Sequence, residues 1–271
     1  MDGPLVSVIL PTRNSEGTIG VCLRSIVEQT YRNIEVIVVD NYSTDGTREV
    51  AAAYGARVFM QGPERTAQRN YGAQNALGEY LLFVDADFDL CPLVVEECVA
   101  RCSGTRGQAL VIPERAVGQG FWARCKALEK ECYIGDDTIE AARFFDRASF
   151  WGVSGYDECL VMAEDWDLHL RVQASGARIG RVDAMIHHHE GRARLSDTVR
   201  KKFYYGRTLH LYLNKHRDMA RRQLVLLRPA FARNARRLAR DPLHAAGMMF
   251  MKACEFGAGG AGYAYGRWRR C

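Results

Sequence analysis

The stretch Tyr80–Asp89 constrains what this chain can fold into more than any other part of the sequence. It is an apolar run that ends in three carboxylates at alternate positions, Asp85, Asp87 and Asp89. An unbroken apolar run rich in Leu, Phe and Val predicts a strand that is buried on both faces of a sheet. The three acids then lie at the C-terminal end of that strand, where open α/β sheets bind their ligands.

The close spacing of these acids indicates a cation. Neighbouring carboxylates repel one another, and burying them without a partner costs free energy. Hard oxygen ligands suit Mg²⁺ or Mn²⁺, and such ions often share their remaining positions with substrate phosphates. We therefore predict a site for Mn²⁺ or Mg²⁺. A solvated acidic turn is the alternative for so short a motif.

Strands and helices alternate through the first half of the chain. Strand patterns cover residues 5–10, 34–40 and 58–60, and helical patterns cover 19–27, a segment that ends near 54, and 66–76. This alternation predicts βαβ units and a mostly parallel, Rossmann-like sheet flanked by helices. Asp40 ends the second strand, so we expect it on the same edge as Asp85, where it can accept hydrogen bonds from a base or a ribose.

Two nucleotide-binding classes lack support in the sequence. No Gly-x-Gly-x-x-Gly follows the first strand, and no Gly-Lys-Ser/Thr loop occurs. A dinucleotide dehydrogenase and a P-loop enzyme are therefore poor interpretations. A sugar nucleotidyltransferase would need a glycine-rich basic loop after the first strand, which Pro11–Gly17 does not provide.

Five motifs in order resemble the signatures of family 2 glycosyltransferases, which carry the GT-A fold. They are Val8–Asn14, Val38–Thr47, Arg69–Ala73, Asp85–Asp87 and Glu164–Asp167. The resemblance covers roughly residues 5 to 205, and five ordered motifs are far more specific than any one of them. It implies metal-dependent, inverting transfer of a sugar from a nucleotide-sugar.

The resemblance also implies a donor site. Thr12 and Asp40 match positions that hold the base and the ribose, and Arg69 matches a basic residue that approaches the nucleotide. Asp85 and Asp87 match the Asp-x-Asp pair that contacts ribose and metal. The expected nucleotide-sugar-binding residues are Pro11, Thr12, Arg13, Asp40, Arg69, Asp85, Ala86 and Asp87.

Further metal ligands are expected downstream. Asp89 matches a position that supplies a ligand in polyprenyl-phosphate sugar transferases, a related branch. Neutral imidazole binds Mn²⁺-like ions, and several relatives place a histidine on the metal from the region of Ile186–Gly191. Its three adjacent histidines cannot all converge on one point, because alternate side chains of a strand face opposite ways. We favour His188, so the predicted metal ligands are Asp85, Asp87, Asp89 and His188.

The segment Glu164–Asp167 opens a predicted helix. Acids in a first turn stabilise a helix through its dipole, which is the alternative explanation for them. Inverting displacement needs one base to take the proton of the acceptor hydroxyl. By resemblance that base is Asp165, with Glu164 and Asp167 as the other candidates. A polyprenyl phosphate needs a base less, so the motif favours a hydroxyl on a glycan, a lipid-linked sugar or a small natural product.

Basic residues gather towards the C-terminus. The cluster Arg200–Arg207 either holds the departing diphosphate or forms a solvated helix face. Residues 216–240 contain eight arginines against one acid, a pattern that predicts binding to the anionic cytoplasmic face of a membrane. Residues 243–265 are too polar and glycine-rich for a span, and predict an interfacial or re-entrant helix before the aromatic-basic tail 263–270. A helical hairpin packed on the catalytic domain or on a second subunit is the alternative.

The cysteines and the N-terminal residues predict the cellular location of the protein. Nine scattered cysteines without a Cys-x-x-Cys pair indicate reduced thiols in a cytosol, and the first residues lack the pattern of a secretory signal. We expect a cytoplasmic protein, peripheral on the cytoplasmic face of the membrane, with a GT-A domain over residues 1–210 and a basic amphipathic helical extension over 211–271.

The predicted function is transfer from a nucleotide-sugar, with UDP favoured over GDP, by a hexosyl- or N-acetylhexosaminyl-transferase. The alternatives are a polyprenyl-phosphate sugar transferase and, in a different class, a catalytically silent membrane-associated nucleotide-binding protein. No recognised nucleic-acid module surrounds the arginines, so nucleic acid is not an expected partner. The sugar, the acceptor and whether the chain forms a homo-oligomer stay open.

Overall fold

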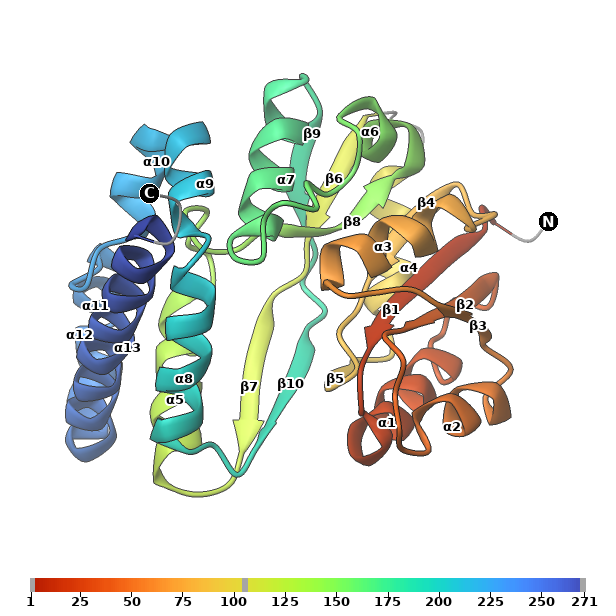
Figure 1. Cartoon of the computed structure of the whole chain (residues 1–271). Coiled ribbons are helices and arrows are strands. Elements are labelled where there is room, and N and C mark those ends of the chain that lie inside the picture. The colour runs from red at the N-terminus through yellow and green to blue at the C-terminus, as the bar shows by residue number, and fades with distance from the viewer. Residues whose placement is uncertain (1–2, 104–106, 269–271) are drawn as a thin grey trace. The chain divides into compact units, whose positions relative to one another are not determined.

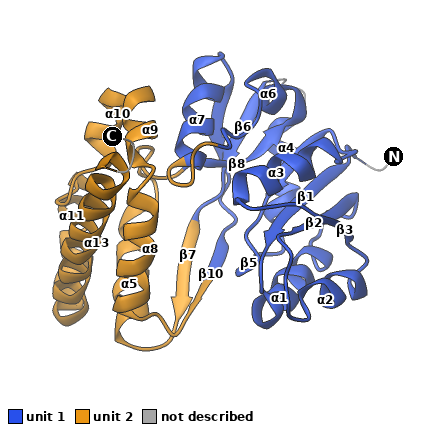
Figure 2. Cartoon of the chain, in the orientation of Figure 1, with its two compact units in different colours: residues 1–113, 141–158, 164–188 blue, residues 114–140, 159–163, 189–271 orange. Residues whose placement is uncertain are grey.

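The chain folds into two compact units, which are described separately (Figures 1 and 2). A computed structural model describes residues 3–103 and 107–268. Unit 1 contains residues 1–113, 141–158 and 164–188, and unit 2 contains residues 114–140, 159–163 and 189–271. The chain therefore passes between the units five times, after residues 113, 140, 158, 163 and 188.

Unit 1 is built on a seven-stranded sheet with the order β3-β2-β1-β4-β8-β6-β9. Every neighbouring pair is parallel except those of β8, which runs antiparallel to β4 and β6. This arrangement confirms the predicted mostly parallel sheet. The strands are β1 (Val6–Thr12), β2 (Ile34–Asp40), β3 (Arg57–Met60), β4 (Tyr80–Phe83), β6 (Gln108–Val111), β8 (Ala142–Asp146) and β9 (Arg178–Arg181).

The register of the sheet aligns the ends of the central strands. Thr12 lies opposite Asp40 in the β1–β2 pair, and Ile9 lies opposite Phe83 in the β1–β4 pair. Parallel strands that end together bring the residues after them to one edge. The structure thereby confirms that Asp40, the last residue of β2, and Asp85, which follows β4, lie at the same edge of the sheet.

The first strand is longer than its proline suggests. We expected β1 to end before Pro11, but the strand continues to Thr12. The pairing of β1 with β4 stops at Ile9, so Pro11 has a strand neighbour on the β2 side only. A residue without an N–H is tolerated where a strand has lost one of its neighbours.

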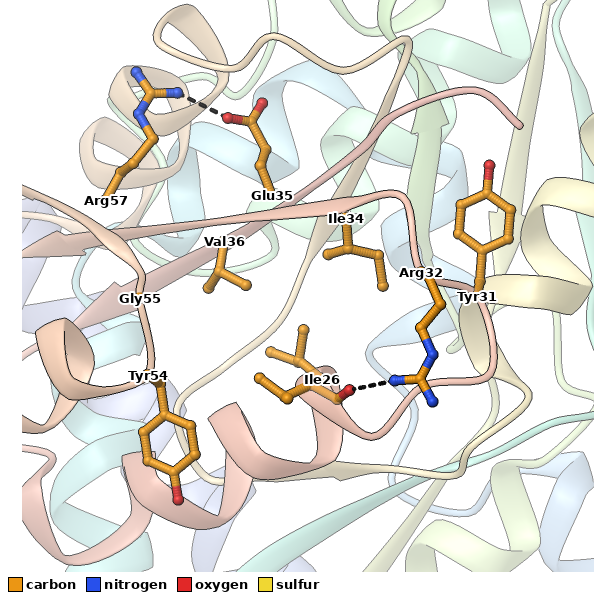
Figure 3. A pocket seen from close by; sticks show the side chains of 10 residues that line it. Ile26, Tyr31, Arg32, Ile34, Glu35, Val36, Tyr54, Gly55 and Arg57 are labelled. Atoms are coloured by element: carbon orange, nitrogen blue, oxygen red, sulfur yellow. Dashed lines mark hydrogen bonds and ion pairs between the residues drawn. The ribbon is translucent and has the colours of Figure 1, made fainter. Parts of the chain in front are cut away.

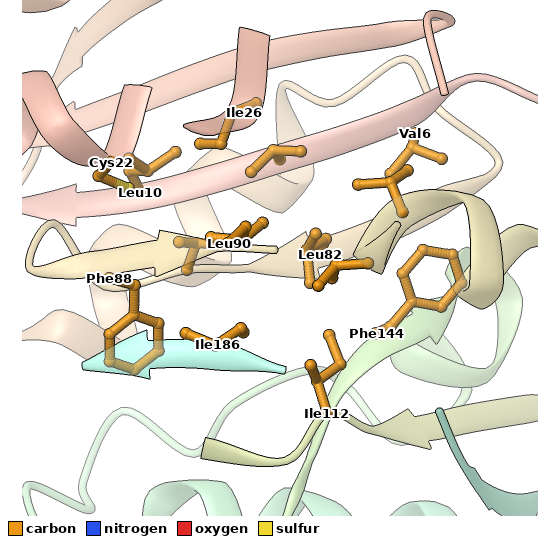
Figure 4. Close-up of a cluster of buried hydrophobic side chains, with 14 of the residues drawn as sticks. Val6, Leu10, Cys22, Ile26, Leu82, Phe88, Leu90, Ile112, Phe144 and Ile186 are labelled. Atoms are coloured by element: carbon orange, nitrogen blue, oxygen red, sulfur yellow. The ribbon is translucent and has the colours of Figure 1, made fainter. Parts of the chain in front are cut away.

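Side chains of the central strands point alternately to two hydrophobic clusters. Leu10 and Leu82 lie in the cluster of Figure 4, while Ile9 and Phe83 lie in the cluster on the other face. Burial of each such side chain stabilises the fold by about 1.5–3 kcal/mol. The unbroken apolar run before Asp85 is therefore a strand covered on both faces, as predicted.

Helices supply the cover for both faces of the sheet. Side chains of α1, α2 and α4 enter the first cluster, and side chains of α3, α6 and α7 enter the second. The helices of unit 1 are α1 (Glu16–Val27), α2 (Thr47–Ala53), α3 (Arg65–Gln74), α4 (Val94–Cys102), α6 (Arg147–Gly152) and α7 (Glu164–Ala174).

A short antiparallel ladder stands outside the main sheet. Strand β5 (Phe88–Leu90) pairs with the first half of β10 (Ile186–Gly191), so that His187 lies opposite Asp89 and His188 opposite Phe88. The histidines are thus on a strand, where alternate side chains face opposite ways.

Unit 2 is mostly helical. Its long helix α13 (Pro242–Trp268) packs on α5 (Phe121–Tyr133), α8 (Leu195–Gly206) and α12 (Ala235–Arg240). Its core joins α5, α11 and α13 through residues such as Leu128, Phe231 and Met251. The remaining elements are β7 (Glu114–Gly118), α9 (Leu209–Lys215), α10 (Arg217–Gln223) and α11 (Pro229–Arg233).

The basic C-terminal region forms helices as expected. Pro229 and Pro242 each stand at a helix start, where a missing N–H is tolerated. Residues 269–270 of the expected tail lie outside the described residues. Within residues 3–103 and 107–268, no helix has both the length and the apolar character needed to cross a bilayer. The functional division at residue 210 stays a prediction, because the compact units group residues 114–140 and 189–210 with the C-terminal helices.

Candidate active site

A fully buried arginine joins the acids of two motifs. Arg69, on α3, has no exposed side-chain surface. Its Nη2 donates to Asp85 Oδ1 at 2.8 Å, and its Nη1 donates to Asp165 Oδ1 at 2.9 Å and to Glu164 Oε1 at 3.4 Å. The guanidinium also lies 5.1 Å from the ring centre of Tyr156. Arg69 therefore ties the end of β4 to the start of α7.

Asp85 lies between two arginines. While Oδ1 accepts from Arg69, Oδ2 is 3.7 Å from Nη1 of Arg143 on β8. Burial alone would raise the pKa of Asp85, but the charges of Arg69, Arg143 and Arg65 hold that pKa well below its usual range. Asp85 is thus a carboxylate at neutral pH, with both oxygens facing guanidinium groups.

Arg143 is a site residue whose position the sequence did not predict. Its guanidinium stacks 4.9 Å from the ring centre of Phe88, and only 13% of its side chain is exposed. Its place beside Asp85 follows from the antiparallel pairing of β8 with β4, a long-range contact that no local pattern encodes.

Two of the four predicted metal ligands lie together. His188 Nε2 is 3.2 Å from Asp87 Oδ2, and the ladder between β5 and β10 sets this contact by placing His188 opposite Phe88. The imidazole packs against the Phe88 ring at 4.9 Å between centres. A carboxylate oxygen beside an imidazole nitrogen fits Mn²⁺ or a similar ion that takes further oxygen ligands from a phosphate.

The other two predicted ligands are placed differently. Both oxygens of Asp85 face arginines, and Asp89 is opposite His187 in the ladder. Among the residues that the structure describes, no group of three or more His, Cys, Asp or Glu side chains is arranged to hold a metal. A metal ion held by Asp87 and His188 would therefore have most of its coordination positions left for the oxygens of a bound ligand.

A buried carboxylate organises the turn after β2. Asp40 accepts hydrogen bonds from Thr12 Oγ1 at 2.9 Å and from the Ser43 N–H at 2.7 Å, and the Ser43 hydroxyl also donates to it. Asp40 has no exposed surface and Thr12 has 2%. Gln68 supports this edge by donating to the carbonyls of Thr12 and Val39 at 2.9 and 2.6 Å.

Tyr42, in the same turn, is a second residue that the sequence did not single out. Its backbone is left-handed, with φ of 51°, and 65% of its surface is exposed. Such a conformation is unfavourable for a residue with a bulky side chain and persists where surrounding contacts impose it, often at functional sites. Of the other predicted donor residues, Pro11 and Ala86 are buried and Arg13 is exposed.

The three acids of α7 have different surroundings. Asp167 is wholly buried and pairs with Arg171 at 2.7 Å. Glu164, with 6% of its side chain exposed, also contacts Arg65 at 3.2 Å. Burial and the neighbouring Asp165 raise the pKa of Glu164. Asp165 keeps 26% of its side chain exposed, so it is the most accessible of the three.

The pocket in Figure 3 lies at the opposite end of β2 from Asp40. It has a volume of about 450 Å³ and an apolar floor that includes Ile34 and Val36. Glu35 on its rim is paired with Arg57 at 2.8 Å. This pocket is therefore separate from the acids described above.

Comparisons with known proteins identify the family and the fold. The family model described as "Glycosyl transferase family 2" matches residues 7–153. The chain is 27% identical over 238 residues to the succinoglycan biosynthesis protein ExoA of Rhizobium meliloti, which covers 78% of the chain and 71% of ExoA. It is 36% identical over 88 residues to the glycosyltransferase GlyA of Streptococcus pneumoniae, 30% of the chain and 13% of GlyA. The chain thus spans only a small part of the length of GlyA.

A solved structure resembles the whole chain. The mannosyltransferase PcManGT from Pyrobaculum calidifontis, in complex with GDP-Man and Mn²⁺, superposes with a TM-score of 0.64 at 17% sequence identity. The superposition covers 99% of this chain and 88% of PcManGT.

Proposed function

The chain belongs to glycosyl transferase family 2 and has the GT-A fold that its sequence predicts; from this premise we propose that it transfers a sugar from a nucleotide-sugar to a hydroxyl group. The observation that carries the proposal is the bridge by Arg69 between Asp85 at the end of β4 and Asp165 at the start of α7. It holds a donor-side acid and the predicted base in one fixed arrangement.

The nucleotide binds at the edge where β1 and β2 end. Hydrogen bonds from Thr12 and from the Ser43 N–H fix the carboxylate of Asp40. A side chain fixed in this way suits the recognition of a base and a ribose. The exposed ring of Tyr42 supplies a surface on which a base can stack, an interaction of about 1–3 kcal/mol. UDP remains our favoured donor nucleotide, and the GDP-Man bound by PcManGT makes GDP the alternative.

Asp87 and His188 are the residues that would hold a divalent ion. When bound, such an ion neutralises charge on the diphosphate leaving group. The fit rests on the 3.2 Å contact between the two side chains, and the Mn²⁺ in PcManGT supports the choice of metal. Asp85 already faces Arg69 and Arg143, so its role is to position the site around the donor.

Asp165 takes the proton of the acceptor. As the hydroxyl oxygen attacks the anomeric carbon, the nucleotide diphosphate leaves from the opposite face, which inverts the configuration. Burial alone would lower the pKa of Arg69, but the charges of the neighbouring acids raise that pKa well above its ordinary value. Arg69 therefore stays charged and keeps Asp165 in place. The acceptor is a hydroxyl on a glycan, a lipid-linked sugar or a small natural product.

The proposal is tested first by nucleotide binding. Titration calorimetry with UDP and with GDP, each with and without Mn²⁺, should show metal-dependent binding of one nucleotide. Asp87→Ala should weaken it by about 10- to 100-fold, the range seen when even outer-shell partners of a metal are changed. Asp183→Ala, which removes an acid that is 90% exposed, is the matched control. No metal-dependent binding of either nucleotide would contradict the proposal.

The role of Asp165 is tested by Asp165→Asn. Loss of a general base should lower the transfer rate by about 10²- to 10⁴-fold, while the affinity for the nucleotide stays close to that of the native protein. If Asp165→Asn keeps its activity and Glu164→Gln loses it, Glu164 is the base instead.

A further inference from the structure

Helix α13 buries two of its charged side chains and exposes a row of apolar ones, while Arg267 in its last turn is exposed. Lys252 and Glu255 are buried, with 5% and 3% of their surface exposed, and they pair with each other at 3.1 Å. Both also pair with α5, Lys252 with Glu129 at 2.8 Å and Glu255 with Lys126 at 3.2 Å. A helix on the surface of a water-soluble protein shows the opposite pattern.

The outer face of α13 is an unbroken apolar stripe. Residues three or four positions apart share a face of a helix, and every exposed position of α13 from 243 to 264 carries an apolar side chain or none. The exposed Arg267 follows in the last turn. The three large side chains of this face are mostly exposed, Leu243 by 67%, Phe250 by 57% and Trp268 by 75%. The outer stripe consists of Leu243, Ala246, Phe250, Ala253, Gly257, Gly260, Ala264 and Trp268.

Two of the helices that pack on α13 expose basic residues. Helix α12 packs beside α13 and exposes Arg236, Arg237 and Arg240, while α8 packs beside it and exposes Arg200 and Lys201. From residue 189 to 268, the described exposed residues include thirteen lysines and arginines but only two acids, at positions 197 and 218.

We propose that the outer stripe of α13 is a docking surface for an anionic phospholipid membrane, on which the helix lies flat. At 1.5 Å per residue the stripe is about 38 Å long, and its apolar side chains enter the boundary between headgroups and acyl chains. Arginines of α12 and basic residues of α8 contact the lipid phosphates. Exposed apolar stripes of this length mark interaction sites rather than ordinary surface.

The charge of unit 2 selects a lipid surface over a second copy of this chain. Two copies that paired through their stripes would bring two strongly basic surfaces together, and like charges oppose that association. An anionic membrane provides the complementary charge. The surface lies outside the candidate active site, so membrane binding and sugar transfer can be tested separately.

Co-sedimentation of the full chain with vesicles tests the proposal. The protein should bind vesicles of phosphatidylcholine with phosphatidylglycerol, and bind vesicles of phosphatidylcholine alone much more weakly. Phe250→Gln should weaken binding about tenfold, because the ring no longer enters the apolar layer. Arg236→Gln and Arg240→Gln should each weaken it about fivefold.

The matched control is Leu77→Gln. Leu77 is 70% exposed in unit 1, so its replacement removes a comparable apolar side chain away from the stripe and should leave vesicle binding unchanged. Binding of nucleotide with Mn²⁺ should be the same in all four variants.

Two results would overturn the proposal. One is a protein that does not bind anionic vesicles, or binds them equally well after Phe250→Gln. The other is a dimer by light scattering that Phe250→Gln converts to a monomer with vesicle binding unchanged, which would assign the stripe to contacts between copies.

Discussion

Among single residues, Arg69 determines how the acids of the candidate active site are arranged. The sequence motif predicted an arginine that approaches the nucleotide, and that contact stays a prediction. The structure shows that the guanidinium is buried and bonded to Asp85, Glu164 and Asp165. Replacing this buried guanidinium by a neutral side chain is costly, because the negative charge of the acids around it would be left uncompensated in a low-dielectric interior.

Arg69→Met should therefore destabilise the protein strongly. Removing one partner of a buried ion pair costs about 3–5 kcal/mol, and the loss is measured by urea unfolding. Arg57→Met is the control: Arg57 pairs with Glu35 but has 42% of its side chain exposed, so the cost should stay below about 1 kcal/mol. Equal losses in the two variants would show that the Arg69 bridge adds no stability.

Lys202 is the least satisfied member of a buried charge cluster in unit 2. The cluster contains the lysines 126, 202 and 252 and the glutamates 129 and 255. Burial lowers the pKa of Lys202 from 10.5 to about 8, although Glu255 lies 4.0 Å away. Because the folded state binds this proton more weakly than the unfolded state, charged Lys202 costs stability at pH values below 8. That cost disappears as the pH rises from about 8 to 10.5.

Lys202→Met should accordingly stabilise the protein at neutral pH. We expect a gain of up to about 1 kcal/mol at pH 7, less than the full shift implies because 32% of the side chain is exposed. At pH 10.5 the variant and the native protein should have the same free energy of unfolding. A variant that is less stable at pH 7 would show that Lys202 is held favourably by Glu255.

At the scale of elements, α8 and α13 approach each other at glycines. A Cβ on Gly262 would contact the backbone of Phe203 and Gly206, and a Cβ on Gly206 would contact the backbone of Gly259. A Cβ on Gly260, in the same helix, would meet no atom within 4 Å. The close packing of α8 on α13 therefore requires a glycine at position 262 of α13 but not at position 260.

Gly262→Ala and Gly260→Ala should have opposite effects. The first should destabilise the protein by about 1–3 kcal/mol, because the two backbones must separate. The second should stabilise it by about 0.4–1 kcal/mol, since alanine restricts the unfolded chain. Thermal unfolding followed by circular dichroism compares them, and similar melting temperatures would mean that α8 and α13 do not pack as closely as described.

Elements with a clear local pattern were predicted, and those defined by distant partners were not. The bounds predicted for β2 agree with the structure, because this strand combines a continuous apolar run with marked ends. Strand β8 was not predicted, since its place depends on β4 and β6. Likewise Asp87 and His188 were proposed as metal ligands from residue type and resemblance, a role that stays a prediction, whereas their contact depends on the ladder between β5 and β10.

For the molecule as a whole, the predicted division at residue 210 can be tested directly. The core of unit 2 includes Phe231, Met248 and Met251, which pack with Cys125 and Leu128 of α5. A chain that ends at residue 210 lacks the first three and exposes the last two. We expect this fragment to lose cooperative unfolding and to aggregate. A soluble fragment with a native-like melting transition would show that residues 1–210 fold alone.

The chain crosses between the two units five times, which limits how recombination could exchange a whole unit in such a protein. Neither unit is one continuous stretch, so no single recombination event can replace one unit and keep the other. An engineer who wants to combine unit 1 with unit 2 of a relative must join the sequences at five places, one of them directly before Glu164. New specificity in this architecture is therefore expected to arise by substitutions within the units rather than by exchange of modules.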